Sequence, residues 1–379
     1  MKLLHLVIDD KFIDAAIREF EAVAPGRHDY VMLDTRPPYR YVKDTRVRRV
    51  DAAEFAREAA REDVRAVVFH CLPPAHLEAL RGVPPGRHVI WIGWGYDYYG
   101  LLNDAFPDGL LGPATAGLLA RMAAPPPGAA ALGPAPAVLS FARPYRKPTA
   151  HEIEALKRVD VFCPVLDTEY RLARRHQPWL RAQYLRWNYG TVEDDFSLAD
   201  APAGPPGPNL LVGNSATPAN NHLELFDTIR RRIDLAGRQV VVPLSYGDPH
   251  YRRHVLQAGA AAFGTAFVPL VDYMPREDYI RTLASCGFAL MNHVRPQALG
   301  NIYISALLGA RIFLDRRNPL HAWLRDHGLP VADIEQADTV PLSGAERDAQ
   351  ASALVAGMGR AAQRERTRRL VDFALSPPA

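Results

Sequence analysis

Cysteine is scarce in this sequence, and its spacing excludes two classes of domain. The 379 residues contain three cysteines, Cys71, Cys163 and Cys286, which lie far apart. Disulfide-rich scaffolds need several cysteine pairs, and structural zinc sites need closely spaced Cys or His ligands. We therefore expect three small buried thiols in a reducing compartment.

Long apolar runs are also missing. A membrane-spanning helix needs about 18 or more apolar residues in a row, and no stretch of the chain reaches that length. The opening MKLLHLVIDDKF has a short apolar stretch that Asp9 and Asp10 interrupt, which is unlike the apolar region of a signal peptide. We therefore predict a strand from position 3, and only peripheral contact with a membrane.

Lysine is rare, and the charge is nearly balanced. Five of the 45 basic residues are lysines, and the net charge is +3. Nucleic-acid binding is disfavoured, because it calls for a concentrated basic face with interleaved aromatic residues. With 48% hydrophobic and 23% charged residues, the chain has the composition of a folded protein, and its length favours two domains.

Short apolar runs alternate with helical patterns along the first half. LLHLVI, RAVVFH and HVIWIGW are runs of this kind, and patterns such as DAAEFAREAAREDV separate them. The alternation indicates a parallel sheet covered by helices on both faces. Residues 123–136 are rich in Pro and Gly and are predicted to form a loop, and a second such cluster, residues 199–208, marks a domain boundary.

The second half repeats this rhythm. NLLVGN, RQVVVPLS, FGTAFVPLV, GFALMNH and ARIFLD are its predicted strands, and the C-terminal residues have a helical pattern. We predict an α/β protein of two Rossmann-like domains that face each other across a cleft. The expected parts are a first domain over 1–198, a second domain over 209–345, and a helical segment over 346–379 that packs back on the first domain.

Polar residues follow three predicted strands of the second domain. They are Gly213, Asn214 and Ser215 after the first strand, Pro243, Ser245 and Tyr246 after the second, and Gln297, Gly300 and Asn301 before a long helix. Ligands of open α/β sheets bind beyond the carboxyl ends of strands, where helix N-termini attract phosphate. The alternative for the first group is a tight turn with a helix cap, because Asn and Ser are common capping residues.

In the first domain, the densest signal is WIGWGYDYYG, residues 91–100. Trp94, Tyr96 and Tyr98 surround Asp97 at a strand end, and aromatic faces beside one carboxylate suit a sugar ring. Asp97 is the first candidate for a general base on an acceptor hydroxyl, and His70, at the end of VVFH, is the second. The alternatives are a capping role for Asp97 and a structural role for His70.

Several segments together resemble one enzyme family. They are VVFH, WIGWGYDYY, LVGNS with the following Asn220, Asn221 and His222, VVVPLSYGDPHY, REDYIRTLASCGFALMNHVRPQALGNI and ARIFLDRRNPLHAWLRDHGLPV. These segments resemble the TDP-N-acetylfucosamine:lipid II N-acetylfucosaminyltransferases, glycosyltransferase family 56. The likeness extends over roughly residues 65–335. The segment QALGN, residues 297–301, departs from the family's Gln-Gly-x-Gly-Thr-like sequence, because Ala-Leu precedes Gly300 and Asn301 replaces the Thr.

The resemblance implies a GT-B fold and transfer of an amino- or deoxyhexose in bacterial surface-polysaccharide synthesis. It implies a TDP- or UDP-linked sugar donor on the second domain, a polyprenyl-diphosphate-linked saccharide acceptor near the first, and neither metal nor cofactor. The enzyme would lie in the cytoplasm, on the inner membrane's cytoplasmic face. The resemblance also assigns residues: the donor would be bound by Gly213, Asn214, Ser215, Pro243, Ser245, Tyr246, His293, Gln297, Gly300 and Asn301, and the acceptor by Trp94, Tyr96 and Tyr98, with Asp97 and His70 as catalytic candidates.

Two other readings of the sequence stay open. The same scaffold could carry a nucleotide-sugar epimerase or a non-catalytic nucleotide-sugar-binding protein, because fold does not fix function. The arginine-rich residues 36–50 could dock on an anionic membrane surface or on the pyrophosphate of a polyprenyl carrier, or could form a solvated loop.

Overall fold

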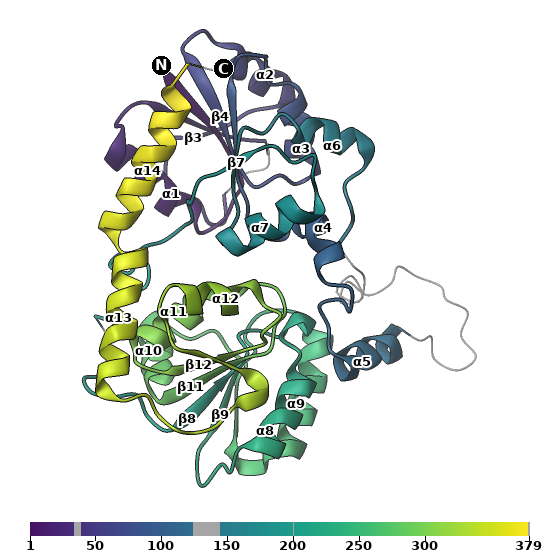
Figure 1. The fold of residues 1–379 in the computed structure, drawn as a ribbon, viewed down its shortest axis with the longest axis vertical. Helices are drawn as coiled ribbons and strands as arrows, with labels where there is room; N and C mark the ends of the chain where they lie inside the picture. Colours follow the sequence, from purple (N-terminus) through teal and green to yellow (C-terminus); the bar gives the residue numbers. More distant parts are fainter. Residues whose placement is uncertain (34–38, 124–144, 200, 378–379) are drawn as a thin grey trace. The chain divides into compact units, whose positions relative to one another are not determined.

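The computed structural model describes residues 1–33, 39–123, 145–199 and 201–377, which divide into two compact units (Figure 1). Unit 1 contains the described residues of 1–107, 145–195 and 357–379, and unit 2 those of 108–144 and 196–356. Most of the predicted loop at 123–136 lies outside the described residues. Within the described part of the chain, no helix has the length and apolar character needed to cross a bilayer.

Unit 1 is built on a seven-stranded parallel sheet with the strand order β3-β2-β1-β4-β5-β6-β7. Its strands are β1 Lys2–Val7, β2 His28–Met32, β3 Val47–Arg49, β4 Val64–His70, β5 His88–Ile92, β6 Val161–Cys163 and β7 Gln183–Tyr184. β1 pairs in parallel with both β2 and β4. The chain winds away from β1 in one direction and from β4 in the other, so a topological switch point lies between these two strands.

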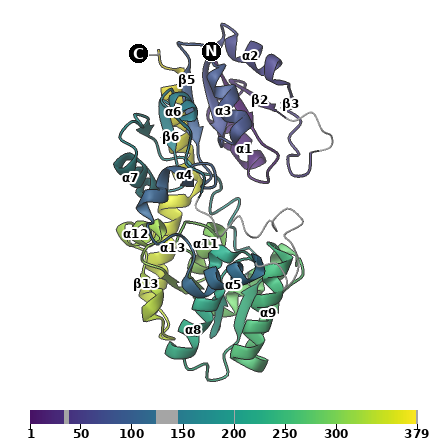
Figure 2. The same cartoon turned by 90° about the vertical axis from the view of Figure 1, so that its right-hand side faces the viewer.

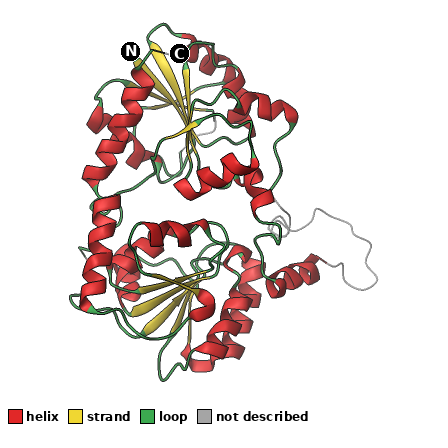
Figure 3. Cartoon of the chain, in the orientation of Figure 1, coloured by secondary structure: helices red, strands yellow, loops and turns green. Residues whose placement is uncertain are grey.

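Helices cover both faces of this sheet, as Figure 3 shows by colour. They are α1 Ile13–Val23, α2 Ala52–Ala60, α3 Pro74–Arg81, α4 Tyr99–Leu102, η1 Asn103–Ala105, α6 Ala150–Leu156, α7 Asp167–His176 and α14 Arg360–Leu375. One face carries α14, which contacts α1, β1 and β4, and the other carries α2, which contacts β4 and α3. Because both faces are covered, the central strands are mostly apolar, and the histidines His5 of β1 and His70 of β4 are buried among them.

Unit 2 is built on a six-stranded parallel sheet with the order β10-β9-β8-β11-β12-β13. Its strands are β8 Asn209–Val212, β9 Val240–Pro243, β10 Phe267–Leu270, β11 Cys286–Met291, β12 Arg311–Leu314 and β13 Val331–Asp333. β8 pairs in parallel with both β9 and β11, and the winding direction reverses between β8 and β11. The carboxyl ends of these three strands are therefore neighbours at one edge of the sheet.

The described helices of unit 2 are α5 Pro113–Ala123, η3 Pro218–Asn220, α8 His222–Arg232, α9 Pro249–Phe263, η4 Gly264–Ala266, α10 Arg276–Ala284, α11 Leu299–Leu307, α12 Pro319–Asp326, η5 Ile334–Gln336 and α13 Gly344–Met358. Five of them pack in two groups. One group joins α5, α8 and α9, which lie together in Figure 2, and the other pairs α10 with α11.

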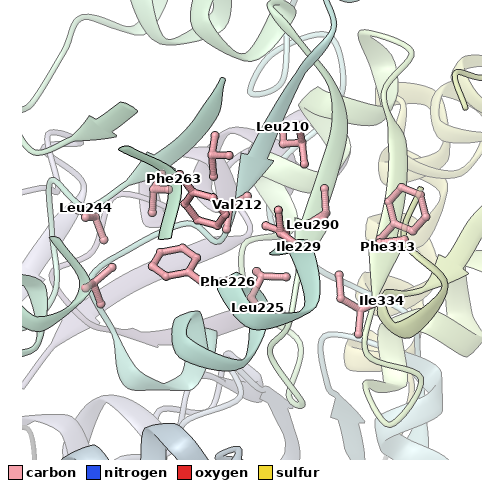
Figure 4. Packing of buried hydrophobic residues seen from close by; sticks show 14 of the residues in the cluster. Leu210, Val212, Leu225, Phe226, Ile229, Leu244, Phe263, Leu290, Phe313 and Ile334 are labelled. Atoms are coloured by element: carbon pink, nitrogen blue, oxygen red, sulfur yellow. The ribbon is translucent and has the colours of Figure 1, made fainter. Parts of the chain in front are cut away.

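The core of unit 2 shows why the strands form where the apolar runs predict them. Leu210 and Val212 of β8 point into the cluster that Figure 4 shows, where they pack with Leu225 and Phe226 of α8. Leu211, between them, is equally buried but outside this cluster. Successive strand residues face opposite sides of a sheet, so a sheet covered on both faces needs continuous apolar runs.

The α/β prediction with two parallel sheets is confirmed, and so is the burial of all three cysteines. The expected parts differ from the two units in two places. α5 precedes the boundary at 199–208 but belongs to unit 2, where Thr115 donates to the Glu224 carboxylate from both its amide and its hydroxyl. The C-terminal residues divide, so that α13 up to Ala356 belongs to unit 2 and α14 to unit 1.

Candidate active site

The turn after β8 is held by its own side chains. Gly213 has a φ of +67°, and a Cβ atom there would lie 2.9 Å from Nε2 of His222. The Asn220 side chain fastens the turn: its Oδ1 accepts from the backbone N–H of Asn214 at 3.1 Å, and its Nδ2 donates to the Ser215 carbonyl at 3.0 Å. Packing and backbone geometry therefore account for the glycine.

Ser215 takes part in the same network. Its hydroxyl lies 3.0 Å from that of Thr217 and accepts from Nδ2 of Asn220 at 3.2 Å, and the residue is only 2% exposed.

Asn221, next to Asn220, has a left-handed backbone with a φ of 51°. Its side chain accepts from the Gly112 amide at 2.8 Å and donates to the carbonyl of Asn292 at 2.9 Å. The residues Asn220, Asn221 and His222, which follow LVGNS, thus stabilise the fold of unit 2.

Asn214 has a different orientation. Its Nδ2 donates to the hydroxyl of Tyr246 at 2.8 Å, and Nε2 of Gln297 lies 3.5 Å from its Oδ1. Tyr246 is 59% exposed. These three side chains come from the ends of β8, β9 and β11, so the structure brings together one predicted residue from each of the three predicted groups.

The N-terminus of α11 borders this cluster. The helix follows Ala298, which has a φ of 58° and no side chain that can cap the first turn. The first four backbone N–H groups of a helix lack partners within the helix, and here no N-cap side chain accepts from them. Asn301, in this first turn, donates through Nδ2 to the Tyr279 hydroxyl at 2.9 Å, and desolvation raises the pKa of Tyr279. Such a helix end attracts anions.

The other predicted donor residues differ in exposure. Pro243 is the buried last residue of β9, Ser245 is exposed, and Gly300 is partly exposed in α11. His293 is 0% exposed, and Nδ2 of Asn318 donates to its Nδ1 at 2.8 Å and to its carbonyl at 2.7 Å. Desolvation lowers the pKa of His293 to about 3. His293 is therefore a buried neutral group that fixes the loop after β11.

In unit 1, Asp97 connects two loops. Its Oδ2 accepts from Nε1 of Trp91 at 2.8 Å and from the Leu72 amide at 3.0 Å, and its Oδ1 accepts from the Trp94 amide at 2.8 Å. Desolvation raises the pKa of Asp97, although each of these hydrogen bonds lowers it. The carboxylate thus holds together the ends of β4 and β5.

His70 lies inside unit 1, within a row of hydrogen-bonded groups. Its Nε2 is 3.0 Å from Nδ1 of His5, whose Nε2 is 3.0 Å from Nδ1 of His28. Its own Nδ1 is 2.7 Å from the hydroxyl of Tyr189, which accepts from Nε1 of Trp94 at 2.8 Å. His70 is 0% exposed, and desolvation lowers its pKa to about 3. This burial separates His70 from any surface on which an acceptor could lie.

The three predicted aromatic residues divide by exposure. Tyr96 is 45% exposed and donates to Sγ of Cys71 at 3.2 Å, whereas Tyr98 is 1% exposed and donates to Oε2 of Glu169 at 2.7 Å. Trp94 is partly exposed. The hydroxyl of Tyr98 is thus committed to the interior, which leaves Trp94 and Tyr96 on the surface.

The comparisons with known proteins identify the family. Residues 159–350, just over half of the chain, match the family described as 4-alpha-L-fucosyltransferase, glycosyl transferase group 56. The chain belongs to glycosyltransferase group 56. The matched segment contains every strand of unit 2.

Solved structures that resemble this group 56 transferase show its fold. OtsA in its ligand-free form has a TM-score of 0.63 at 9% identity, with all of both chains covered. A trehalose-6-phosphate synthase of Burkholderia multivorans has a TM-score of 0.59 at 12% identity, covering 99% of this chain and 98% of that one. HepE of Anabaena, solved with UDP and glucose, has a TM-score of 0.55 at 11% identity, covering 99% of both. The predicted GT-B fold is confirmed, and the chain is a glycosyltransferase.

The transferase has two site features that the sequence reasoning missed. Asn318 and Tyr279 hold His293 and Asn301, and both lie in segments that carry the family resemblance, RRNPLHAWL and REDYIRTL. A cavity of about 240 Å³ in unit 1 lies beside Asp97 and Tyr96, with Leu77 and Leu101 in its largely apolar lining. In the described part of the chain, no three His, Cys, Asp or Glu side chains are grouped as a metal site would require.

Proposed function

We propose that this glycosyltransferase moves an amino- or deoxyhexose from a nucleoside-diphosphate sugar, TDP- or UDP-linked, to a polyprenyl-diphosphate-linked saccharide. The observation that carries the proposal is the cluster of Asn214, Tyr246 and Gln297 at three neighbouring strand ends, beside the uncapped N-terminus of α11. Ligands of open α/β sheets bind at such edges.

In this proposal the donor lies on unit 2. The diphosphate faces the first turn of α11, where free backbone N–H groups and the helix dipole favour negative charge. Asn214 and Gln297 donate to phosphate or sugar oxygens, and the exposed Tyr246 ring stacks on the base or ribose. These groups neutralise the leaving diphosphate, so the reaction needs no metal ion.

Two comparisons support this donor. HepE was solved with UDP and glucose, and the E. coli trehalose-6-phosphate structure, with a TM-score of 0.52 at 10% identity and covering 99% of this chain and 95% of that one, contains UDP-2-fluoro glucose. The family description names a fucosyl group, which is a deoxyhexose.

The acceptor, in the same proposal, lies at the carboxyl edge of the unit 1 sheet, near Trp94, Tyr96 and Asp97. The family resemblance supports a lipid-linked saccharide and a place on the cytoplasmic face of the inner membrane, in bacterial surface-polysaccharide synthesis. Residues 36–38 of the arginine-rich segment lie outside the described residues; within the described part, Arg46 pairs with Asp44 at 2.5 Å and Arg48 with Glu58 at 2.8 Å, which gives membrane docking by these two arginines little support.

The purified full chain tests the proposal in one assay. It is incubated with TDP- and UDP-sugars, with and without a polyprenyl-diphosphate saccharide, and release of nucleoside diphosphate is measured in buffer and in excess EDTA. We expect the acceptor to accelerate this release well above the slow hydrolysis of the donor, and we expect the release to persist in EDTA. Loss of activity in EDTA would contradict metal independence. Isomerisation of the donor sugar without acceptor and without release of nucleoside diphosphate would indicate an epimerase, and binding without turnover would indicate a binding protein.

A further inference from the structure

Three carboxylates lie at or just after the carboxyl end of β1, and two of them hold a neighbouring loop. Asp9 accepts hydrogen bonds from the backbone amides of residues 40–42 at 2.6–3.0 Å. Asp14 accepts from the amides of residues 43 and 44 at 3.1–3.2 Å. These bonds give both acids a structural role.

Asp10, the third carboxylate, accepts fewer hydrogen bonds. Its Oδ1 accepts from the amide of Phe12 at 3.1 Å, and the Lys11 amide also stabilises the charged carboxylate. The side chain is partly buried, and desolvation raises its pKa. Asp10 therefore has more capacity to accept a proton than Asp97, whose two oxygens already accept three hydrogen bonds.

Asp10 follows β1 at the topological switch point of unit 1, where open α/β sheets bind ligands. Desolvation is the main cause that raises the pKa of Cys71 after β4, of Tyr96 after β5 and of Tyr189 after β7, and the negative charge of Asp10 adds to each shift. Asp9 and Lys11 on its own loop act on it in opposite senses: Asp9 raises the pKa of Asp10 and Lys11 lowers it.

Aromatic rings lie beside Phe12, two residues after Asp10. Phe12 is 40% exposed, and its ring centroid lies 5.7 Å from that of Trp94 and 5.8 Å from that of Tyr189. Tyr96, which is 45% exposed, follows β5 at the same edge of the sheet. Aromatic faces near a carboxylate provide both stacking for a pyranose ring and an acceptor for one of its hydroxyl protons.

We propose that Asp10 is the base that takes the acceptor's proton, and that Asp97 is a positioning residue that holds the loops after β4 and β5. This inference rests on the proposed function. The acceptor oxygen forms a bond to the anomeric carbon of the donor sugar. The bond from that carbon to the diphosphate oxygen breaks, and its electron pair leaves with the nucleoside diphosphate. The hydroxyl proton goes to Oδ2 of Asp10.

The test compares the wild type with Asp10→Asn, Asp10→Ala and Asp97→Asn. Calorimetry with TDP and UDP measures donor-site binding. Turnover is followed over pH with the acceptor, and also as slow hydrolysis of the donor, in which water replaces the acceptor. Because the base must be ionised, the wild-type rate should rise with pH through the raised pKa of Asp10. Cys71, Tyr96 and Tyr189 should not produce this rise, because the pKa of each is raised and these groups lose their protons only at high pH.

We expect Asp10→Asn to lower kcat about 100-fold or more and to change nucleotide affinity less than about threefold. The variant should also lose the rise of the rate with pH through the pKa of Asp10, which is the acidic limb of the pH profile. Formate should partly restore turnover to Asp10→Ala, because a small carboxylate can replace the missing base. Asp97→Asn should keep the acidic limb. If the wild type turns over and Asp10→Asn stays within about tenfold of it, or keeps the acidic limb, the assignment of Asp10 is wrong. A wild type that neither binds TDP or UDP nor cleaves any donor would instead overturn the proposed function itself, and this inference with it.

Discussion

Nδ2 of Asn214 donates a 2.8 Å hydrogen bond to the hydroxyl of Tyr246, which joins the ends of β8 and β9 at the candidate donor site. The adjacent Ser215 points its hydroxyl into the turn, towards Thr217 and Asn220. Two neighbouring polar residues of one motif therefore have different orientations and different expected roles.

This difference leads to a paired prediction. Asn214→Ala removes a donor at the edge and should weaken nucleoside-diphosphate binding by roughly 1.5–3 kcal/mol, the usual contribution of a hydrogen bond to a charged group. Ser215→Ala removes a buried hydroxyl and should lower the free energy of unfolding by about 1 kcal/mol, with affinity nearly unchanged. Calorimetric titration and urea unfolding measure the two effects. Equal losses of affinity in both variants would return Ser215 to the binding site.

The three hydrogen bonds of Asp97 predict a stability effect. In Asp97→Asn, the amide NH₂ replaces one carboxylate oxygen and faces a donor, either the Trp94 amide or the pair formed by Leu72 and Trp91. We expect a loss of about 2 kcal/mol or more in the free energy of unfolding, because buried donors lose their acceptor. Asp104→Asn, at an exposed acid paired with Lys147, is the matched control and should change it by less than about 0.5 kcal/mol. Equal denaturation midpoints for the two variants would contradict this role.

The predicted strands correspond to the short, continuous apolar runs, and the strands that were missed lack such runs. β3, β7 and β13 have two or three residues each and lie at sheet edges or ends, where little apolar surface is needed. β2, HDYVM, begins with two polar residues. Its His28 is buried because a second histidine, His5, bonds it across the sheet, and a single-sequence pattern cannot show such a pairing.

The sequence predicted which strand ends form the candidate site, but not which side chains are exposed there and which are buried. Parallel strands place their carboxyl ends at one edge, so Asn214, Tyr246 and Gln297 were expected to be neighbours. Burial depends instead on tertiary partners far apart in sequence. Tyr98 is buried by Glu169, and Asp10, within the apolar start of the chain, differs from Asp9 only in which amides each one meets.

The buried histidines of unit 1 predict a loss of stability in acid. Desolvation lowers the pKa of His28 to about 4 and of His70 to about 3, from an ordinary value near 6.5, and it lowers that of His5 well below this value. As pH falls below about 6.5, these histidines bind protons in the unfolded chain, whereas in the folded unit they stay neutral until the pH reaches their lowered pKa. The stability contribution is therefore present above pH 6.5 and is lost as pH falls towards 4, by roughly 1.4 kcal/mol per pH unit for each histidine.

Unfolding by urea at several pH values measures this slope. His70→Gln should reduce the slope between pH 6.5 and 4.5 by up to about one proton. His151→Gln, at an exposed histidine, is the control and should leave it unchanged. An identical slope in the wild type and in His70→Gln would show that His70 does not contribute to the acid sensitivity.

The approach of two loops at Gly247 predicts a steric effect beside the donor site. Gly247 has a φ of +115°, and a Cβ atom there would lie 2.5 Å from the backbone of Ala216. The Ala216 amide donates to the carbonyl of Tyr246 at 2.7 Å, so a shift of either loop would move Tyr246 away from Asn214. Gly247→Ala should lower the free energy of unfolding by about 3 kcal/mol or more, since strain and overpacking each contribute about 1–3 kcal/mol. It should also weaken nucleotide binding.

Gly237→Ala is the matched control, because Gly237 has a φ of +84° but no atom within 4 Å of the added methyl group. This variant should lose about 1–2 kcal/mol in the free energy of unfolding and keep the nucleotide affinity. Unfolding and nucleotide titration of both variants separate the clash from the backbone strain, and equal losses in the two would show that the contact with Ala216 has no effect.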